Sequence, residues 1–121
     1  MARVLRRTPI ETTRIDLSDI RRNLGVSRER MARLLDVSAK TIERWEERGT
    51  VPANRTAIDR LSRLRDVADL GLQVYTPEGF HTFLTVPMPA FGGHSALQMI
   101  ELGDVDLVYG EIVADYEGSG F

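Results

Sequence analysis

Apolar residues recur every three or four positions along most of this chain, which is the spacing of amphipathic helices rather than of strands. The stripes predict helices at about residues 16–24, 27–35, 38–45, 54–70, 76–84, 95–103 and 104–116. Between residues 86 and 93, two prolines and two glycines interrupt the pattern and predict a shaped loop. The pattern therefore predicts an all-α protein.

Residues that favour helix ends stand at the borders of these stripes. An N-cap side chain accepts a hydrogen bond from a backbone N–H that the first helical turn leaves unpaired. The expected N-caps are Asp16, Ser27, Ser38, Thr76, Ser95 and Asp104. Pro77 follows Thr76 at the first helical position, and Gln98 completes a capping box with Ser95. Gly25 is an expected helix stop, since glycine readily adopts the left-handed conformation.

Residues 26–45 have the layout of a helix-turn-helix. Two short helices begin eleven residues apart, and Asp36 falls at the tight turn between them, where aspartate tolerates a left-handed backbone. Ala32 is small enough for two helices to cross closely. The inward-facing residues are Met31, Leu34 and Leu35 on the first helix and Ile42 and Trp45 on the second.

The second of these helices presents a polar, partly basic surface that suits the major groove of DNA. In a helix-turn-helix, the start of the second helix reaches base edges, where Arg and Lys pair with guanine acceptors. The expected base-edge residues are Ala39, Lys40, Thr41 and Arg44. The expected phosphate contacts are Ser27, Arg28, Ser38 and Arg55. The alternative is an ordinary helical hairpin with solvated charges.

Charge divides the chain into two unlike parts. All sixteen Lys and Arg residues lie within residues 1–70, alongside eleven acids, whereas residues 71–121 carry seven acids and no base. A basic region releases counterions on binding DNA, while an acidic one is repelled by it and suits a protein partner. We therefore expect a basic N-terminal arm at 1–15, a DNA-binding domain at 16–70, and an acidic helical domain at 71–121 with a flexible C-terminal tail.

The second domain is too small to bury a stable core by itself. We expect it to pack against the long helix before it or against a second copy. A homodimer is also expected because two-fold pairing lets two recognition helices read neighbouring half-sites. The absence of cysteine, of a long apolar run and of a signal-like start favours a soluble, cytoplasmic protein.

No constellation for catalysis or metal binding is evident. His81 and His94 are the only histidines, and neither has further ligands at matching spacing. No nucleophile stands beside a base. We therefore expect neither an enzyme nor a cofactor or metal site.

Two stretches resemble known families. Residues 27–46, Ser-Arg-Glu-Arg-Met-Ala-Arg-Leu-Leu-Asp-Val-Ser-Ala-Lys-Thr-Ile-Glu-Arg-Trp-Glu, with Gly49 and Pro52 after them, resemble the Xre-type helix-turn-helix of phage repressors and antitoxins. Residues 83–87, 91–100 and 108–118, with Gly103, resemble the toxin-binding C-terminal domain of Xre/MbcA/ParS-type antitoxins. The family usually has glycine at position 36, tryptophan at 83 and proline at 96.

This resemblance implies an antitoxin whose partner is a RES-domain toxin, an enzyme of ADP-ribosyltransferase-like fold that consumes NAD or modifies a target with it. The antitoxin would block the toxin's pocket and repress its own promoter by binding double-stranded operator DNA. An acidic surface complements an electropositive dinucleotide pocket. The expected toxin-binding residues are Phe91, Glu111, Asp115, Tyr116, Glu117 and Phe121. The alternatives are a stand-alone dimeric helix-turn-helix regulator without a toxin partner, and an interaction adaptor that no longer reads DNA.

Overall fold

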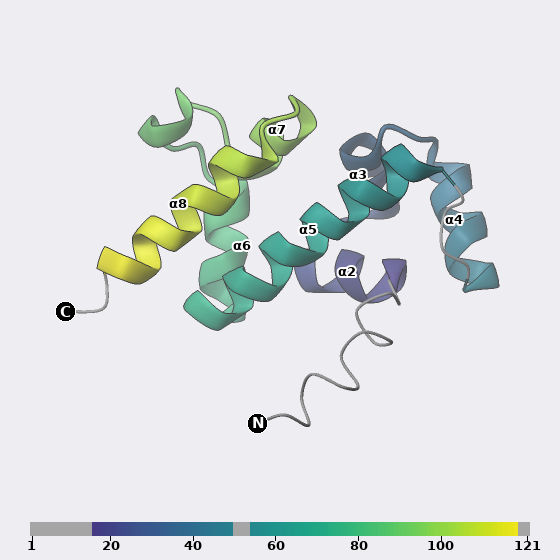
Figure 1. Cartoon of the computed structure of the whole chain (residues 1–121), viewed down its shortest axis with the longest axis horizontal. Coiled ribbons are helices and arrows are strands. Elements are labelled where there is room, and N and C mark those ends of the chain that lie inside the picture. The colour runs from purple at the N-terminus through teal and green to yellow at the C-terminus, as the bar shows by residue number, and fades with distance from the viewer. Residues whose placement is uncertain (1–15, 50–53, 119–121) are drawn as a thin grey trace.

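The computed structural model describes residues 16–49 and 54–118, and within these ranges the chain is helical with no strand (Figure 1). The prediction of an all-α fold is confirmed. The helices are α2 (Leu17–Leu24), α3 (Arg28–Leu35), α4 (Ala39–Arg48), α5 (Arg55–Val74), α6 (Pro77–Thr85), α7 (Ala96–Glu101) and α8 (Val105–Gly118), with a short 3-10 turn, η1 (Pro89–Phe91), before α7. The expected basic arm at 1–15, together with Pro52 and Phe121, lies outside the described residues.

Local capping sets most of the helix boundaries as the sequence predicts. Ser27 Oγ accepts from the Arg30 N–H at 3.1 Å, and Ser38 Oγ accepts from the Thr41 N–H at 3.0 Å. Ser95 and Gln98 form the complete capping box at the start of α7. Asp36 has a φ of 59°, the left-handed turn conformation expected of it between α3 and α4.

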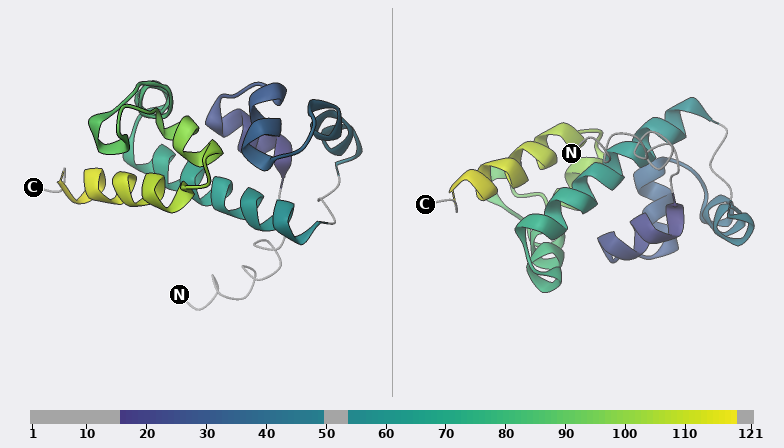
Figure 2. Two further views of the ribbon diagram at one scale, coloured as in Figure 1. Left: turned by 90° about the horizontal axis from the view of Figure 1, so that it is seen from above. Right: turned by 60° about the horizontal axis from the view of Figure 1, so that its bottom comes forward.

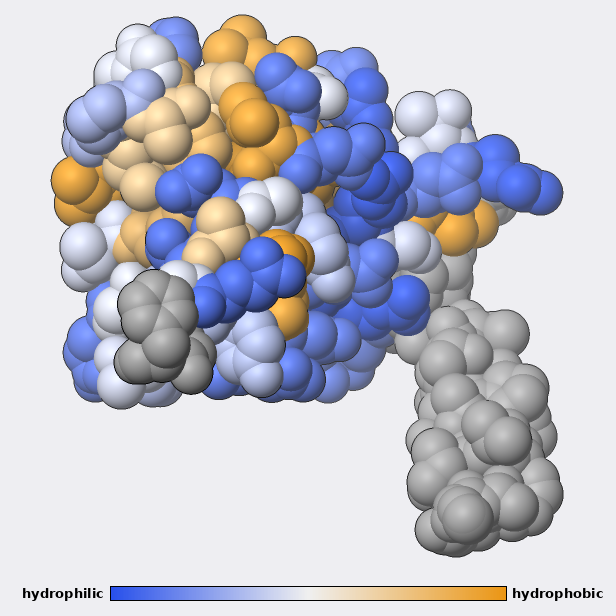
Figure 3. Space-filling view, turned by 60° about the vertical axis from the view of Figure 1, so that its left-hand side comes forward, coloured by the Kyte–Doolittle hydropathy of each residue, from blue (hydrophilic) through white to orange (hydrophobic). Residues whose placement is uncertain are grey.

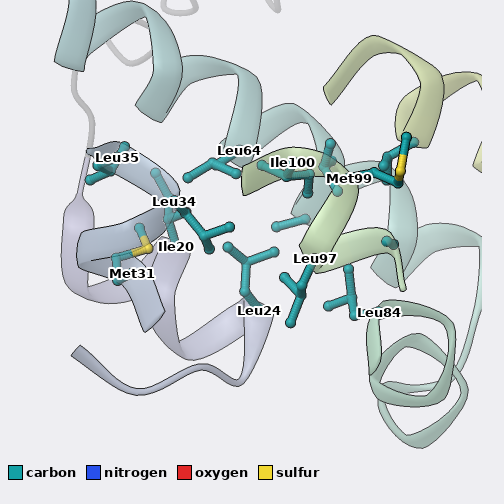
Figure 4. Close-up of a cluster of buried hydrophobic side chains, with 14 of the residues drawn as sticks. Ile20, Leu24, Met31, Leu34, Leu35, Leu64, Leu84, Leu97, Met99 and Ile100 are labelled. Atoms are coloured by element: carbon teal, nitrogen blue, oxygen red, sulfur yellow. The ribbon is translucent and has the colours of Figure 1, made fainter. Parts of the chain in front are cut away.

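Helix α5 is the central element, and helices from both halves of the chain pack on it. α2 and α3 contact it on the N-terminal side, and α6 and α8 contact it on the C-terminal side (Figures 1 and 2). α7 joins the two groups, because it packs against α3 as well as α6 and α8. Figure 4 shows Leu34, Leu64 and Ile100 meeting from α3, α5 and α7. One hydrophobic core therefore runs through the whole described chain.

The expected boundary between residues 70 and 71 falls inside α5, which continues to Val74. Gly71 has no side chain, so α5 can continue at a point where the ring of Phe80 packs directly on its backbone. A Cβ added at Gly71 would lie 2.2 Å from the ring of Phe80, which is itself buried. Tyr75 then stacks on Phe83, with 5.2 Å between the ring centroids. The glycine is thus a packing position within α5.

In the sequence of helix α8, helical spacing predicts one apolar stripe of Val105, Val108, Tyr109, Ile112 and Tyr116, and the structure buries only part of it. Val108 and Ile112 are fully buried, and Val105 is partly buried, as expected. Tyr109 and Tyr116, predicted on the same stripe, are 39% and 62% exposed. The prediction for the two tyrosines was wrong because α8 turns Val108 and Ile112 inward, which leaves Tyr109 and Tyr116 at the edge of the buried side. The periodicity alone does not say which side packs on α5.

Within the described ranges, no helix combines the length and the apolar character that crossing a membrane requires.

Candidate functional site

Helix α4 carries an exposed basic row on a short, well-capped helix. Lys40 and Arg44, both predicted to contact bases, are exposed. Arg48 is exposed as well and lies four residues after Arg44, one helical turn further along the same side. Sequence reasoning missed Arg48, although its spacing from Arg44 could have pointed to it. The structure thus brings three cations onto one outward side of the predicted recognition helix.

Two other predicted base-edge residues are turned more toward the protein. Ala39 is partly buried and packs against the core. Thr41 is half-buried, and its Oγ1 lies 2.9 Å from Ser38 Oγ and accepts from Arg44 Nη2 at 3.4 Å. These contacts tie Thr41 to the first turn of its own helix. The outward surface of α4 is therefore set mainly by its longer, charged side chains.

The inner side of α4 is held by a buried carboxylate. Glu46 is only 4% exposed at its side chain, and it accepts from Arg21 Nε of α2 at 2.6 Å and from Arg28 Nε of α3 at 2.8 Å. Arg21 also donates to the carbonyl oxygen of Val26 at 3.1 Å. Glu46 and its two arginine partners, which we term the Glu46 clamp, therefore hold α4 against the two preceding helices.

The protonation of Glu46 reflects this environment. Burial alone would raise the pKa of its carboxyl, but the hydrogen bonds and positive charges of Arg21 and Arg28 outweigh burial, so the pKa is lowered overall. The pKa of Arg28 is raised, first by its hydrogen bond to Glu46. The Glu46 carboxylate and the Arg28 guanidinium are thus charged at neutral pH.

Replacing Glu46 with glutamine is expected to lower the free energy of unfolding by about 1 to 2 kcal/mol. The loss is moderate because both arginines reach solvent and can rehydrate. Chemical denaturation at pH 7 measures it. Glu47→Gln removes the neighbouring exposed acid and should leave stability nearly unchanged. Equal stability of the two variants would show that the clamp contributes nothing.

The stability that Glu46 contributes through its ion pairs should also depend on pH. Because the pKa of Glu46 is lower in the folded than in the unfolded chain, its stabilisation is present above the unfolded value of about 4.3 and is lost as pH falls through the folded value. We expect the stability difference between wild type and Glu46→Gln to be constant near neutral pH and to shrink in acid. Denaturation curves between pH 7 and pH 3 test this. If the stability difference between wild type and Glu46→Gln were the same at pH 3 as at pH 7, a lowered pKa of Glu46 in the folded protein would be contradicted.

The predicted phosphate contacts have mixed surroundings. Ser27 and Ser38 are exposed N-caps whose hydroxyls already accept from their own helices. Arg55, the first residue of α5, is exposed. Arg28 remains partly accessible, but its Nε is bound to Glu46, a partner that the sequence analysis did not foresee. Contact of these four residues with phosphate stays a prediction.

The predicted toxin-binding residues also differ from one another in how far they are exposed. Tyr116 and Glu117 are exposed near the end of α8, and Glu111 is half-buried. Asp115 accepts a hydrogen bond from the Tyr75 hydroxyl, which fastens α8 to the end of α5. Burial is the main cause that raises the pKa of Tyr75, and the hydrogen bond to Asp115 raises it further. Phe91 is 3% exposed and packs edge-on against Phe83, so its expected role as a surface contact is corrected to a core role.

An ion-pair cluster joins the two halves at the surface. Glu101 Oε2 of α7 lies 2.6 Å from Arg30 Nε and 3.4 Å from Arg33 Nε, both on α3. Together with the shared core, these pairs join the basic and acidic regions.

Comparison with known proteins identifies the family. The antitoxin Xre-like helix-turn-helix domain matches residues 3–66, which is more than half of the chain. The chain belongs to this antitoxin family. The matched region contains α2, α3, α4 and the first part of α5, and therefore the basic row and the Glu46 clamp.

The fold is also similar to a solved structure. A chain in the crystal structure of the M. tuberculosis MbcT-MbcA toxin-antitoxin complex superposes with a TM-score of 0.70 at 24% identity. The alignment covers 84% of the present chain and 91% of that chain, so the likeness extends past the helix-turn-helix into the C-terminal helices. No curated protein matches the sequence.

Proposed function

We propose that this antitoxin binds double-stranded operator DNA through α4 and represses its own promoter. The observation that carries this proposal is the exposed row of Lys40, Arg44 and Arg48 on a helix whose opposite side is fixed by Glu46. A major groove is wide enough to admit one helix, and arginine and lysine read guanine there. A homodimer would place two such helices about 34 Å apart, one turn of DNA.

We further propose that the C-terminal half binds and blocks a RES-type toxin that consumes NAD or modifies a target with it. Residues 71–118 carry acids and no base, so their surface complements the electropositive surroundings of a pocket for a dinucleotide. Glu111, Tyr116 and Glu117 lie on the last two turns of α8, where they could reach such a pocket. The likeness to a chain from a toxin-antitoxin complex supports this proposal.

Two assays with the full-length protein test these roles separately. The first is a gel shift with the DNA upstream of its own gene, which should give a specific complex that survives competitor DNA. The second is growth of cells that express the neighbouring toxin gene, with and without this protein. Growth restored only when both are present supports neutralisation. Specific DNA binding without any protection from a toxin would instead identify a stand-alone regulator.

A further inference from the structure

Gly110 is a residue that the protein's own fold does not explain. It lies inside α8, its φ is not positive, and a Cβ added there would meet nothing within 4 Å. Glycine weakens the interior of a helix relative to alanine. The contrast with Gly71 is plain, because the Phe80 ring occupies the space that a side chain at Gly71 would need. The missing side chain at Gly110 leaves room for something outside this chain.

The surroundings of Gly110 offer a place for an apolar group. A hollow of about 330 Å³ lies between α5 and α8, with Val67, Val105, Tyr109 and Gly110 among its lining residues. Arg63 and Asp106 form an ion pair at this hollow. An aliphatic side chain of a partner could therefore enter between the two helices beside Gly110.

The adjoining side of α8 is apolar and exposed. Leu107 and Ala114 lie three and four residues from Gly110, so helical spacing places these three on what we term the α8 outer face. Leu107 is 44% exposed, and Leu102, just before α8, is 68% exposed. Figure 3 shows apolar atoms gathered on the side of the molecule where the C-terminal helices lie. An exposed apolar surface of this kind typically marks an interaction site.

Charge indicates which partner covers this surface. α8 contains Glu111, Asp115 and Glu117, together with Asp106, which pairs with Arg63 of α5, and it contains no base. The same surface of a second copy would be equally acidic, so two copies would repel each other there. We propose that the α8 outer face and the hollow beside Gly110 dock the toxin through an apolar segment flanked by basic residues. This inference rests on the toxin-binding function proposed above and specifies where the contact is made.

The test measures binding between the purified full-length protein and the toxin by calorimetry. Gly110→Arg adds a long side chain that has room in this chain but would occupy the docking surface, and we expect it to weaken binding about tenfold or more. Gly110→Ala adds one methyl group and should weaken binding less. The control, Thr82→Arg, places the same charge on an exposed position of α6 and should bind within about twofold of wild type.

The outcomes are distinct. Circular dichroism should show that every variant is folded, because neither position is buried. If wild type and Gly110→Arg bind the toxin equally, the docking surface is wrong while the antitoxin function stands. If wild type itself does not bind, the proposed toxin-binding function fails and this inference fails with it. If Gly110→Arg instead converts a dimer to a monomer in sedimentation, a second copy covers this surface and the inference is overturned.

Discussion

Gly71→Ala is expected to lower the free energy of unfolding by about 2 kcal/mol, because the new methyl group collides with the Phe80 ring. The ring has little freedom to move, since it is buried and stacks on Tyr75 at a centroid distance of 6.3 Å. The gain in helix propensity, about 1 kcal/mol, offsets only part of the overpacking. Urea denaturation measures the change.

Gly110→Ala is the matched control for this prediction, because it makes the same chemical change inside another helix. With no neighbour within 4 Å, it should raise stability by about 0.5 to 1 kcal/mol. The two variants should therefore shift the midpoint in opposite directions. Stabilisation by both would mean that Phe80 does not pack on Gly71.

Replacing Lys40 and Arg44 together with alanine is expected to reduce affinity for operator DNA by about 30-fold or more. Each lost base contact removes about 1 to 3 kcal/mol of discrimination, and both side chains are exposed, so the fold should not suffer. Fluorescence anisotropy with operator DNA and with scrambled DNA of equal length separates sequence-specific binding from non-specific binding. The affinity for the operator should fall more than the affinity for the scrambled duplex.

Arg22→Ala provides a comparison for the charge effect, since it removes an exposed cation from α2 rather than from α4. It should lower the affinity for the operator and for the scrambled duplex by the same factor, because a contact that does not read bases carries no sequence information. If the Lys40 and Arg44 variant also lost affinity equally for both duplexes, those side chains would be phosphate contacts rather than base readers.

The parts of the fold that depend on near neighbours in the sequence were predictable. The caps at Ser27, Ser38 and Ser95 each involve a residue three positions away, so the sequence shows both partners. The left-handed turn at Asp36 is likewise a local property. The expected all-α fold and the order of its helices followed from such signals.

The clamp was not predictable, because Arg21 and Glu46 are 25 residues apart and only the packing of α2 on α4 joins them. A partial signal existed. Glu46 lies four residues after the buried Ile42, so helical spacing places it on the inner side of α4.

The C-terminal helices show a second limit of sequence reasoning. The change in charge after residue 70 suggested a boundary there, whereas the sequence gives no sign that Phe80, from the next helix, packs on Gly71. On α8, the spacing of apolar residues left the edge of the buried side undetermined until α5 was seen to pack against Val108 and Ile112. Both cases depend on tertiary contacts rather than on propensity.

The central claim is that one folded chain carries two independent surfaces, one for DNA on α4 and one for the toxin on the C-terminal helices. The most direct measurement is growth of toxin-expressing cells that receive the Lys40→Ala and Arg44→Ala double variant from a constitutive promoter. The account predicts protection equal to that by wild type, although the variant binds the operator much more weakly. Loss of protection by a folded variant would contradict it.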